Sequence, residues 1–318
     1  QDIAEGKMAN VIACYKPTEI IVNQSALKFE RIFANLKKRC DFYLSYVPDE
    51  DFELADCENR VREKFGAYSE SEQALGENKY ALRAAGGALK YLDDTQKVSL
   101  SNISKASVYN SSSFVEIDLS SRRNLELTET MRDKGKKGSL LGILDKTSTS
   151  MGARLLRKWI EQPLINSDEI NMRLDAVEFF VKNIAVRSEA VKALGGIGDI
   201  ERIMSKVVYG SVNARELVAL KNSLLFLSEI KQVSKGFETP YLTRIAESLD
   251  AASDLYKLIN SAFVDDPPLT VREGGMIKPG FDPELDKIKD TVKNGARIIA
   301  EIESREREAT GVKNLKIS

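Results

Sequence analysis

The sequence predicts an α+β protein in which a small α/β domain precedes a mainly α-helical domain with a long C-terminal helix. Near the N-terminus, helical segments alternate with short β-branched and aromatic runs, which is typical of βαβ-like pairing. Further along, successive segments carry helix start signals. The last of these segments has apolar residues at heptad spacing, which predicts one long helix.

Size and composition fit two packed domains. The chain has 318 residues, of which 42% are hydrophobic and 30% charged, and folded domains usually run about 100–200 residues. We place the domains at 1–72 and 73–318. The formal net charge is −1, and Lys and Arg are spread along the chain. This excludes the strongly basic footprint of a dedicated nucleic-acid-binding domain, while local DNA contact stays open.

The α/β domain is predicted from alternating short segments. A helix up to about Tyr15 precedes a strand in EIIVN, and a helix over ALKFERIFANLKKR leads to a second strand in DFYLSYV, which Pro48 ends. A further helix follows near CENRVREKF. Only two strands are visible, and the chain opens at Gln1 within a helical pattern. We therefore expect a truncated domain and an excised piece of a longer protein.

The helical domain is predicted from start and stop signals. In a capping box, the cap side chain and the residue three positions later satisfy each other's backbone amides. The pairs with this spacing are Ser69 with Glu72, Asn166 with Glu169, and Asn213 with Glu216. Pro163 ends the helix SMGARLLRKWIEQ, whereas GKKGSL, a flexible turn, and GGIGD are predicted to be loops.

A short strand is expected within the stretch SSFVEIDLSSRRNLELTETM. Val115, Ile117 and Leu119 alternate there with Glu116 and Asp118. The charged doublet Arg122-Arg123 and the block RNLEL follow directly, without any obvious catalytic pattern.

The final helix opens with Asp282 as N-cap and Pro283 at its first position. It should reach about 40 Å, the length of a lever or strut. Its apolar heptad seam consists of Leu285, Ile288, Val292, Ile299 and Ile302, with Gly295 at one seam position. Because such a seam needs a partner, we expect residues 298–318 to pair with a second copy of the chain or to be poorly ordered.

The sequence offers little for catalysis. It contains no histidine, which removes the commonest general base and metal ligand. GKKGS lacks the spacing of a phosphate loop, and GGIGD lacks the context of a dinucleotide site. An acidic cluster could hold Mg²⁺ in a nuclease, but a solvated acidic turn is favoured. The cluster comprises Asp41, Asp49, Glu50 and Asp51.

One helical face is basic, with Arg154, Arg157 and Lys158 opposite Leu155, Leu156, Trp159 and Ile160. Such a face could touch phosphate, but contact with solvent is favoured, and we expect Trp159 in the core.

The cysteines are Cys14, Cys40 and Cys57, and they form no C-x-x-C pair. This pattern favours neither a disulfide framework nor a zinc site, and it fits a reducing, cytoplasmic compartment. We expect no contact with a membrane, because no stretch approaches the roughly 18 apolar residues of a span and no signal peptide is visible.

Five ordered blocks between about Phe114 and Lys289 carry a family resemblance. They are FVEIDLSSRRNLEL, GSLLGILDKTSTSMGARLLRKWIEQPL, INMRLDAVEFF, GDIERIMSKVVYGSVNARELVALKNSL and VREGGMIKPGFDPELDKIK. Together they resemble the core, or lever, region of the MutS family of DNA mismatch repair proteins. ALRAAGGALKYLDDTQK resembles the helix leading into that core. The α/β segment is similar to the end of the family's connector domain, so the resemblance implies a connector end at 1–72 and a core at 73–318.

The resemblance also assigns residue roles. It implies a motif that specifies the fold, within a structural core and without a catalytic role. Besides Arg122, the motif consists of Arg123, Asn124, Leu125, Glu126, Gly152, Arg154 and Pro163. Weaker candidates for contact with the DNA backbone are Arg305, Arg307, Lys313 and Lys316.

The functional expectation follows from the family. The mismatch-reading domain, the DNA clamp and the ATPase of the family have no counterpart in this sequence, so we expect no enzyme activity, cofactor or metal in the fragment. The full-length protein would use ATP and Mg²⁺, hold mismatched DNA and recruit a MutL-like protein. The fragment would transmit conformational change between the ATPase and the DNA-holding parts. Alternatives are a MutS paralogue in DNA metabolism, a metal-dependent nuclease and a general helical adaptor.

Overall fold

The computed structural model describes residues 8, 10–12, 15, 17–38, 41–66, 78–96, 100, 103, 106 and 113–312. Two compact units divide the chain, one of residues 1–182 with 239–241 and one of residues 183–238 with 242–318. The domain boundary predicted at 72/73 and the Ser69 cap lie outside the described residues.

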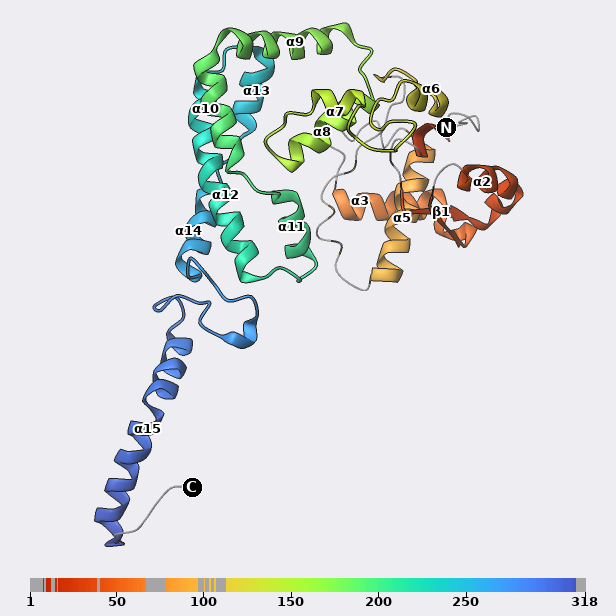
Figure 1. Ribbon diagram of the computed structural model, residues 1–318. Coiled ribbons are helices and arrows are strands. Elements are labelled where there is room, and N and C mark those ends of the chain that lie inside the picture. The colour runs from red at the N-terminus through yellow and green to blue at the C-terminus, as the bar shows by residue number, and fades with distance from the viewer. Residues whose placement is uncertain are drawn as a thin grey trace. The chain divides into compact units, whose positions relative to one another are not determined.

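The described elements confirm an α+β protein with a small parallel sheet and a helical core (Figure 1). The first unit contains β1 (Glu19–Asn23), η1 (Gln24–Phe29), α2 (Glu30–Lys37), β2 (Tyr43–Val47), η2 (Asp49–Phe52), α3 (Leu54–Phe65), α5 (Lys79–Gln96), α6 (Leu119–Asn124), α7 (Leu140–Leu144), α8 (Ser150–Glu161) and α9 (Ser167–Lys182). From Ile184 onward the elements are α10 (Ile184–Gly195), α11 (Ile200–Val208), α12 (Ala214–Val233), η4 (Ser234–Gly236), α13 (Pro240–Ser248), α14 (Ser253–Ala262), η5 (Val271–Glu273) and α15 (Pro283–Thr310).

Both predicted N-terminal strands are confirmed. β1 and β2 pair in parallel, with Glu19 opposite Tyr43 and Asn23 opposite Val47. The predicted helix between them divides into the 3₁₀ helix η1 and the α-helix α2. Phe33 of α2 is buried against Phe42, which anchors this crossover on the sheet.

The helices α3 and α5 approach each other unusually closely. Gly86 of α5 lies over Cys57, and Gly87 lies over the ring of Phe52. An apolar cluster that includes Val61 and Leu82 packs beside this contact. Gly86 therefore sets the spacing of the helix pair, and Gly87 leaves room for the Phe52 ring of η2.

In the second unit, α12 is central. Its residues Leu220 and Leu224 pack with Ile203 of α11 and Ile259 of α14. The predicted capping box at the start of α12 is confirmed, because Asn213 and Glu216 bond each other's backbone amides.

The strand predicted around residues 114–119 is wrong. Phe114 makes only an isolated antiparallel bridge with Leu164, and no strand continues through Val115 and Ile117. The reason is local, because Asp118 accepts a hydrogen bond from the Ser121 amide at 2.8 Å and caps α6. The helix start ends the extended segment.

The long final helix is confirmed. α15 has 28 residues, with the predicted Asp282 cap and with Pro at the start, so it is about 42 Å long. Most of its seam is exposed, namely Ile288, Val292, Ile299 and Ile302. The described part of the chain therefore covers the seam only in part. Within the described residues, no helix combines the length and apolarity needed to cross a bilayer.

Candidate functional site

Two regions contain the candidate functional residues, and the first is the turn after α6. Arg122 Nε donates to the Ile117 carbonyl at 3.0 Å, which ties the charged doublet to the preceding segment. Arg123, Asn124 and Leu125 are exposed. The end of α6 turns these three side chains outward, and their fold-specifying role in the family motif stays a prediction.

Glu126 is the residue that shapes the turn. Its φ is 47°, which a non-glycine residue adopts at a cost of about 1–3 kcal/mol. Two contacts hold it there. The Glu126 carboxylate accepts the Met131 amide at 2.6 Å, and its carbonyl accepts the Leu140 amide at 3.1 Å. The motif thus connects the end of α6 to the start of α7, as a role in specifying the fold requires.

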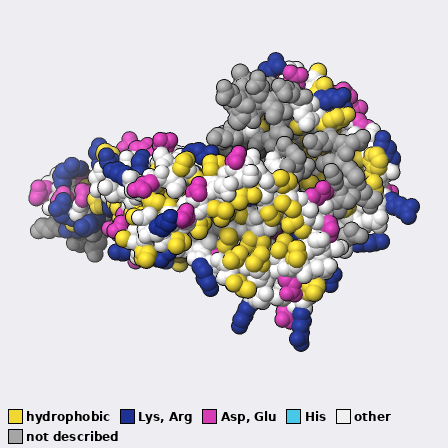
Figure 2. Space-filling model, turned by 90° about the horizontal axis from the view of Figure 1, so that it is seen from above, with side chains coloured by type: hydrophobic (Ala, Val, Ile, Leu, Met, Phe, Trp, Pro, Cys, Tyr) yellow, Lys and Arg dark blue, Asp and Glu magenta, His cyan; other side chains and the backbone are white. Residues whose placement is uncertain are grey.

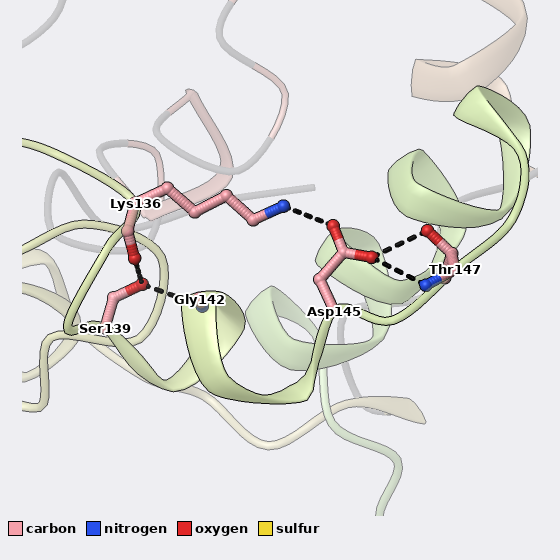
Figure 3. Close-up of polar contacts among 5 residues, drawn as sticks. All are labelled: Lys136, Ser139, Gly142, Asp145 and Thr147. Atoms are coloured by element: carbon pink, nitrogen blue, oxygen red, sulfur yellow. Dashed lines mark hydrogen bonds and ion pairs between the residues drawn. The ribbon is translucent and has the colours of Figure 1, made fainter.

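The GKKGSL loop is closed by Ser139 (Figure 3). Ser139 is fully buried, and its hydroxyl donates to the Lys136 carbonyl at 2.7 Å and accepts the Gly142 amide at 3.1 Å. A Cβ at Gly142 would lie 2.1 Å from that carbonyl. The loop prediction is confirmed, but these bonds fix a turn that the sequence predicted to be flexible.

Asp145 holds the other side of this loop. Its carboxylate pairs with Lys136 and accepts the hydroxyl and amide of Thr147 at 2.6 and 3.1 Å, as the dashed lines in Figure 3 show. The Lys136 hydrogen bond first, and then the Thr147 bonds, lower the pKa of Asp145 from 3.8 to about 2. The carboxylate therefore stays charged at neutral pH.

The remaining motif residues lie on or next to α8. The Gly152 amide donates to the Thr149 hydroxyl at 3.0 Å and completes the helix cap. Pro163 follows the helix end, and its carbonyl accepts the Val115 amide at 2.8 Å. Gly152 and Pro163 thus serve the local fold, whereas the Arg154 side chain is exposed, like those of Arg123, Asn124 and Leu125.

Trp159 has a role that the sequence did not reveal. It is only half-buried, and the Arg173 guanidinium of α9 lies 3.8 Å from its ring centroid. Such a cation–π contact holds α8 and α9 together. On the basic face, Arg157 pairs with Glu161 within the same helix at 3.1 Å.

The second region is the loop between α14 and α15, residues 263–282. Its base is closed by the bridge between Phe263 and Ile277, by the Val264 amide on the Met276 carbonyl at 3.0 Å, and by the Lys278 amide on the Ala262 carbonyl at 2.8 Å. A loop whose ends meet in this way behaves as an Ω-loop.

Two cations of α12 hold this loop. Lys221, with 8% of its side chain exposed, donates to Asp265 at 2.7 Å, although 82% of the Asp265 side chain is exposed. Arg215 Nε donates to the Pro267 carbonyl at 2.8 Å. The Lys221 hydrogen bond, followed by the charges of Lys221 and Lys278, lowers the pKa of Asp265. The first half of the loop is therefore fixed on α12.

Two more cations fix the second half. Lys278 Nζ donates to the Asn260 carbonyl at 2.7 Å, and Lys289, in the second turn of α15, donates to the Ile277 carbonyl at 3.0 Å. We call Arg215, Lys221, Lys278 and Lys289 the root cations. They connect α12 and α14 through the loop to the first turns of α15.

The sequence did not predict the root cations. Lys221 and Asp265 are 44 residues apart, and no short motif joins them. The only local signal is the run DDPPL, in which two acids precede two prolines.

The DNA-backbone candidates stay predictions. Arg305 lies 3.7 Å from Glu306 and Arg307 lies 3.4 Å from Glu303, so neighbouring carboxylates offset both charges. Lys313 and Lys316 lie outside the described residues.

The acidic cluster does not favour a nuclease. Asp49 accepts the side-chain amide of Asn23 at 2.6 Å and the hydroxyl of Ser25 at 2.8 Å. Across the described part of the chain, no group of three or more Cys, Asp or Glu side chains is placed to hold a metal ion. Cys57 is buried, whereas Cys14 and Cys40 fall outside the described residues.

Comparison with known proteins gives a consistent result. The profile of MutS domain III matches residues 120–313, and that of MutS domain II matches residues 1–104. The DNA mismatch repair protein MutS of Ruminiclostridium cellulolyticum is 47% identical over 314 residues, which is 98% of this chain and 35% of that protein. The Acetivibrio thermocellus protein of the same name is 45% identical over 311 residues, again 98% of this chain and 35% of that protein. The chain thus spans about a third of the length of the curated relatives it matches.

Proposed function

The chain belongs to the MutS family, and from this premise we propose that it transmits conformational change between the ATPase and the DNA-holding parts of a longer mismatch repair protein. Its α/β part corresponds to the family's connector domain and its helical part to the core. The relatives named for DNA mismatch repair support this assignment over a paralogue or a nuclease.

The observation that carries the proposal is the rooted helix. α15 extends for 28 residues with a largely exposed seam, and the root cations join its first turns to α12 and α14. A long helix fixed at one end passes a rotation of its base to its far end. This is the mechanical property that a transmission element needs.

The chain itself is proposed to have no enzyme activity, with ATP and Mg²⁺ acting elsewhere in the longer protein. Calorimetry at micromolar chain should show no saturable ATP binding, because no phosphate-loop spacing is present. Saturable binding would contradict this.

DNA and a MutL-like protein are the proposed partners of the longer protein, in the cytoplasm. The chain alone should bind DNA weakly, with a strong dependence on salt and no mismatch preference, since its net charge is −1. Tight binding at physiological salt that favours a G·T mismatch would refute this. Self-association through the exposed seam of α15 is proposed as well, because its four exposed apolar side chains forgo about 6–12 kcal/mol.

The coupling role can be tested in a longer MutS-family protein that carries this segment. Lys221→Met keeps the apolar stem but removes the charge that holds Asp265. We expect DNA-stimulated ATP hydrolysis to fall several-fold, while basal hydrolysis and DNA affinity stay unchanged. The matched control is Lys257→Met, at an exposed lysine of α14. Unchanged stimulation in Lys221→Met would refute transmission through this root.

A further inference from the structure

Arg173 makes the one cation–π contact that joins two helices in the described part of the chain. Its guanidinium, on α9, lies 3.8 Å from the centroid of the Trp159 ring on α8. The other two contacts of this kind, at 5.2 Å, join sequence neighbours, namely Lys28 with Phe29 and Lys79 with Tyr80. Sequence neighbours cannot fix one helix on another, whereas the Arg173 contact can.

The surroundings of Arg173 differ from those of an ordinary surface cation. On the face that Figure 2 shows, several Lys and Arg side chains extend outward from the surface. The Arg173 side chain is half-buried, and within residues 113–312 it forms no ion pair with a carboxylate. The Glu161 carboxylate of α8 pairs with Arg157 instead. The described partner of Arg173 is therefore the Trp159 ring, on which a planar guanidinium can stack.

The corner between α8 and α9 has a fixed backbone. The Ile165 amide donates to the Ser113 carbonyl at 3.2 Å. The Asn166 side chain then accepts the Asp168 amide at 2.8 Å and begins α9. These bonds fix where α9 starts, but its direction depends on contacts further along the helix.

Arg173 supplies a directional contact in the second turn of α9. It lies about 9 Å along the helix axis from Ser167, where α9 begins. Ala176 and Phe179 are buried further along the helix, but the burial of apolar surface has no preferred direction. A stacked guanidinium requires one orientation over the ring, so it also restricts how α9 can turn.

The position of α9 in the chain makes its direction important. α9 ends at Lys182, and the second unit begins at Asn183. α9 is therefore the last helix of the first unit before the chain enters the second. A change in its direction displaces the point at which the chain leaves the first unit.

We propose that Arg173 is a positioning residue, which sets the direction of α9 on α8 through the Trp159 ring, and that conformational change passes through this joint. The inference rests on the transmission role proposed above and names the residue pair that carries it within the first unit. Loss of the cation frees α9 to swing while the backbone bonds of the corner stay closed. The coupling then weakens although both helices stay folded.

The first test uses the full 318-residue chain. Arg173→Met keeps the apolar stem and removes the cation, whereas Arg173→Lys keeps the charge without the planar group. We expect hydrogen exchange in residues 167–175 to become about fivefold faster in Arg173→Met and about twofold faster in Arg173→Lys. The matched control is Arg187→Met, at an exposed arginine of α10, which should leave this exchange unchanged.

Trp159 provides a second readout, because it is the only tryptophan of the chain. Arg173→Ala uncovers one face of the ring, so quenching of its fluorescence by acrylamide should rise about twofold. A double-mutant cycle assigns the pair. In a chain that carries Trp159→Leu, Arg173→Met should no longer make exchange in α9 faster. Circular dichroism checks that each variant is folded.

The coupling is tested in a longer MutS-family protein that carries this segment. DNA-stimulated ATP hydrolysis should fall several-fold in Arg173→Met, and Arg173→Lys should retain more than half of it. Basal hydrolysis and the urea midpoint should stay unchanged in both variants. A merely structural role would lower the urea midpoint and basal hydrolysis together.

Three results would overturn the inference. They are unchanged exchange in Arg173→Met, an equal effect of Arg173→Met in the Trp159→Leu chain, and stimulation that Arg173→Met leaves intact although Lys221→Met lowers it. The last result would reject the joint and keep the transmission role. If both variants leave stimulation intact, the transmission role fails, and this inference fails with it.

Discussion

The close approach of α5 to α3 makes Gly86→Ala a sharp test of the packing. A Cβ at Gly86 would lie 2.4 Å from both Cα and Cβ of Cys57. Carbon atoms in contact normally lie about 3.5–4.0 Å apart. The obstacle includes backbone, so a rotamer change cannot relieve it, and the helices must separate by about 1 Å.

The size of the effect follows from two opposing contributions. Overpacking of a filled contact costs up to about 3 kcal/mol. Replacing glycine by alanine within a helix returns about 1 kcal/mol through helix propensity. We therefore expect Gly86→Ala to lower the free energy of local unfolding by about 2 kcal/mol, which corresponds to roughly 30-fold faster hydrogen exchange in α3 and α5.

Gly295→Ala is the matched control. Gly295 also lies inside a helix, but a Cβ there would meet nothing within 4 Å. Only the gain in helix propensity remains, which is worth about 1 kcal/mol. Hydrogen exchange in α15 should therefore slow by about fivefold. Hydrogen exchange with peptide-level readout measures both variants under one condition.

The reasoning fails if Gly86→Ala protects α3 and α5, or if both substitutions change protection in the same direction. Either result would mean that helix propensity, and no steric limit, governs the α3–α5 contact.

Three other predictions address the loops and the long helix. The pKa of Asp145 is about 2 in the folded chain and 3.8 ordinarily, so the stability that the Asp145 carboxylate adds is complete above about pH 4 and is lost as the pH falls toward 2. The urea midpoints of wild type and Asp145→Asn should therefore differ at pH 7 and converge near pH 2. A difference that stays constant with pH would refute this. Lys221→Met should raise hydrogen exchange across residues 263–278 several-fold, and unchanged exchange would show that the ion pair does not hold the loop. Ile299→Asp with Ile302→Asp should abolish any self-association seen by light scattering, because a paired apolar seam cannot accept two charges. The circular dichroism signal of the other helices should stay unchanged. A monomeric wild type would count against the seam as a contact.

Features that depend on neighbouring residues were predictable. The β-branched run in EIIVN predicted β1, and the side chains of Asn213 and Asp282 predicted the starts of α12 and α15. A local interaction also explains why the strand predicted at residues 114–119 is absent. Apolar and acidic residues do alternate there, but Asp118 caps the helix α6 and so ends the extended segment. A capping bond and an extended segment compete for the same backbone.

Features that depend on distant residues were not predictable from spacing. Nothing near Lys221 indicates that its partner is Asp265, and nothing near Trp159 indicates that Arg173 covers its ring. Leu125 belongs to the predicted family motif, and its side chain is exposed in this chain. The motif residues keep their local bonds, whereas burial depends on the elements that pack around them.

The length of α15 places a mechanical demand on its root. With 28 residues, each degree of tilt at the base moves the far end by about 0.7 Å. If a single root contact fixed the direction of the helix, a displacement of about half an ångström in that contact would therefore become several times larger at the far end of α15. The root cations share that load, two on α12 and two on the returning chain, so no single bond sets the direction of the helix. The number of contacts that hold the start of α15 thus determines how precisely the far end of the helix is positioned.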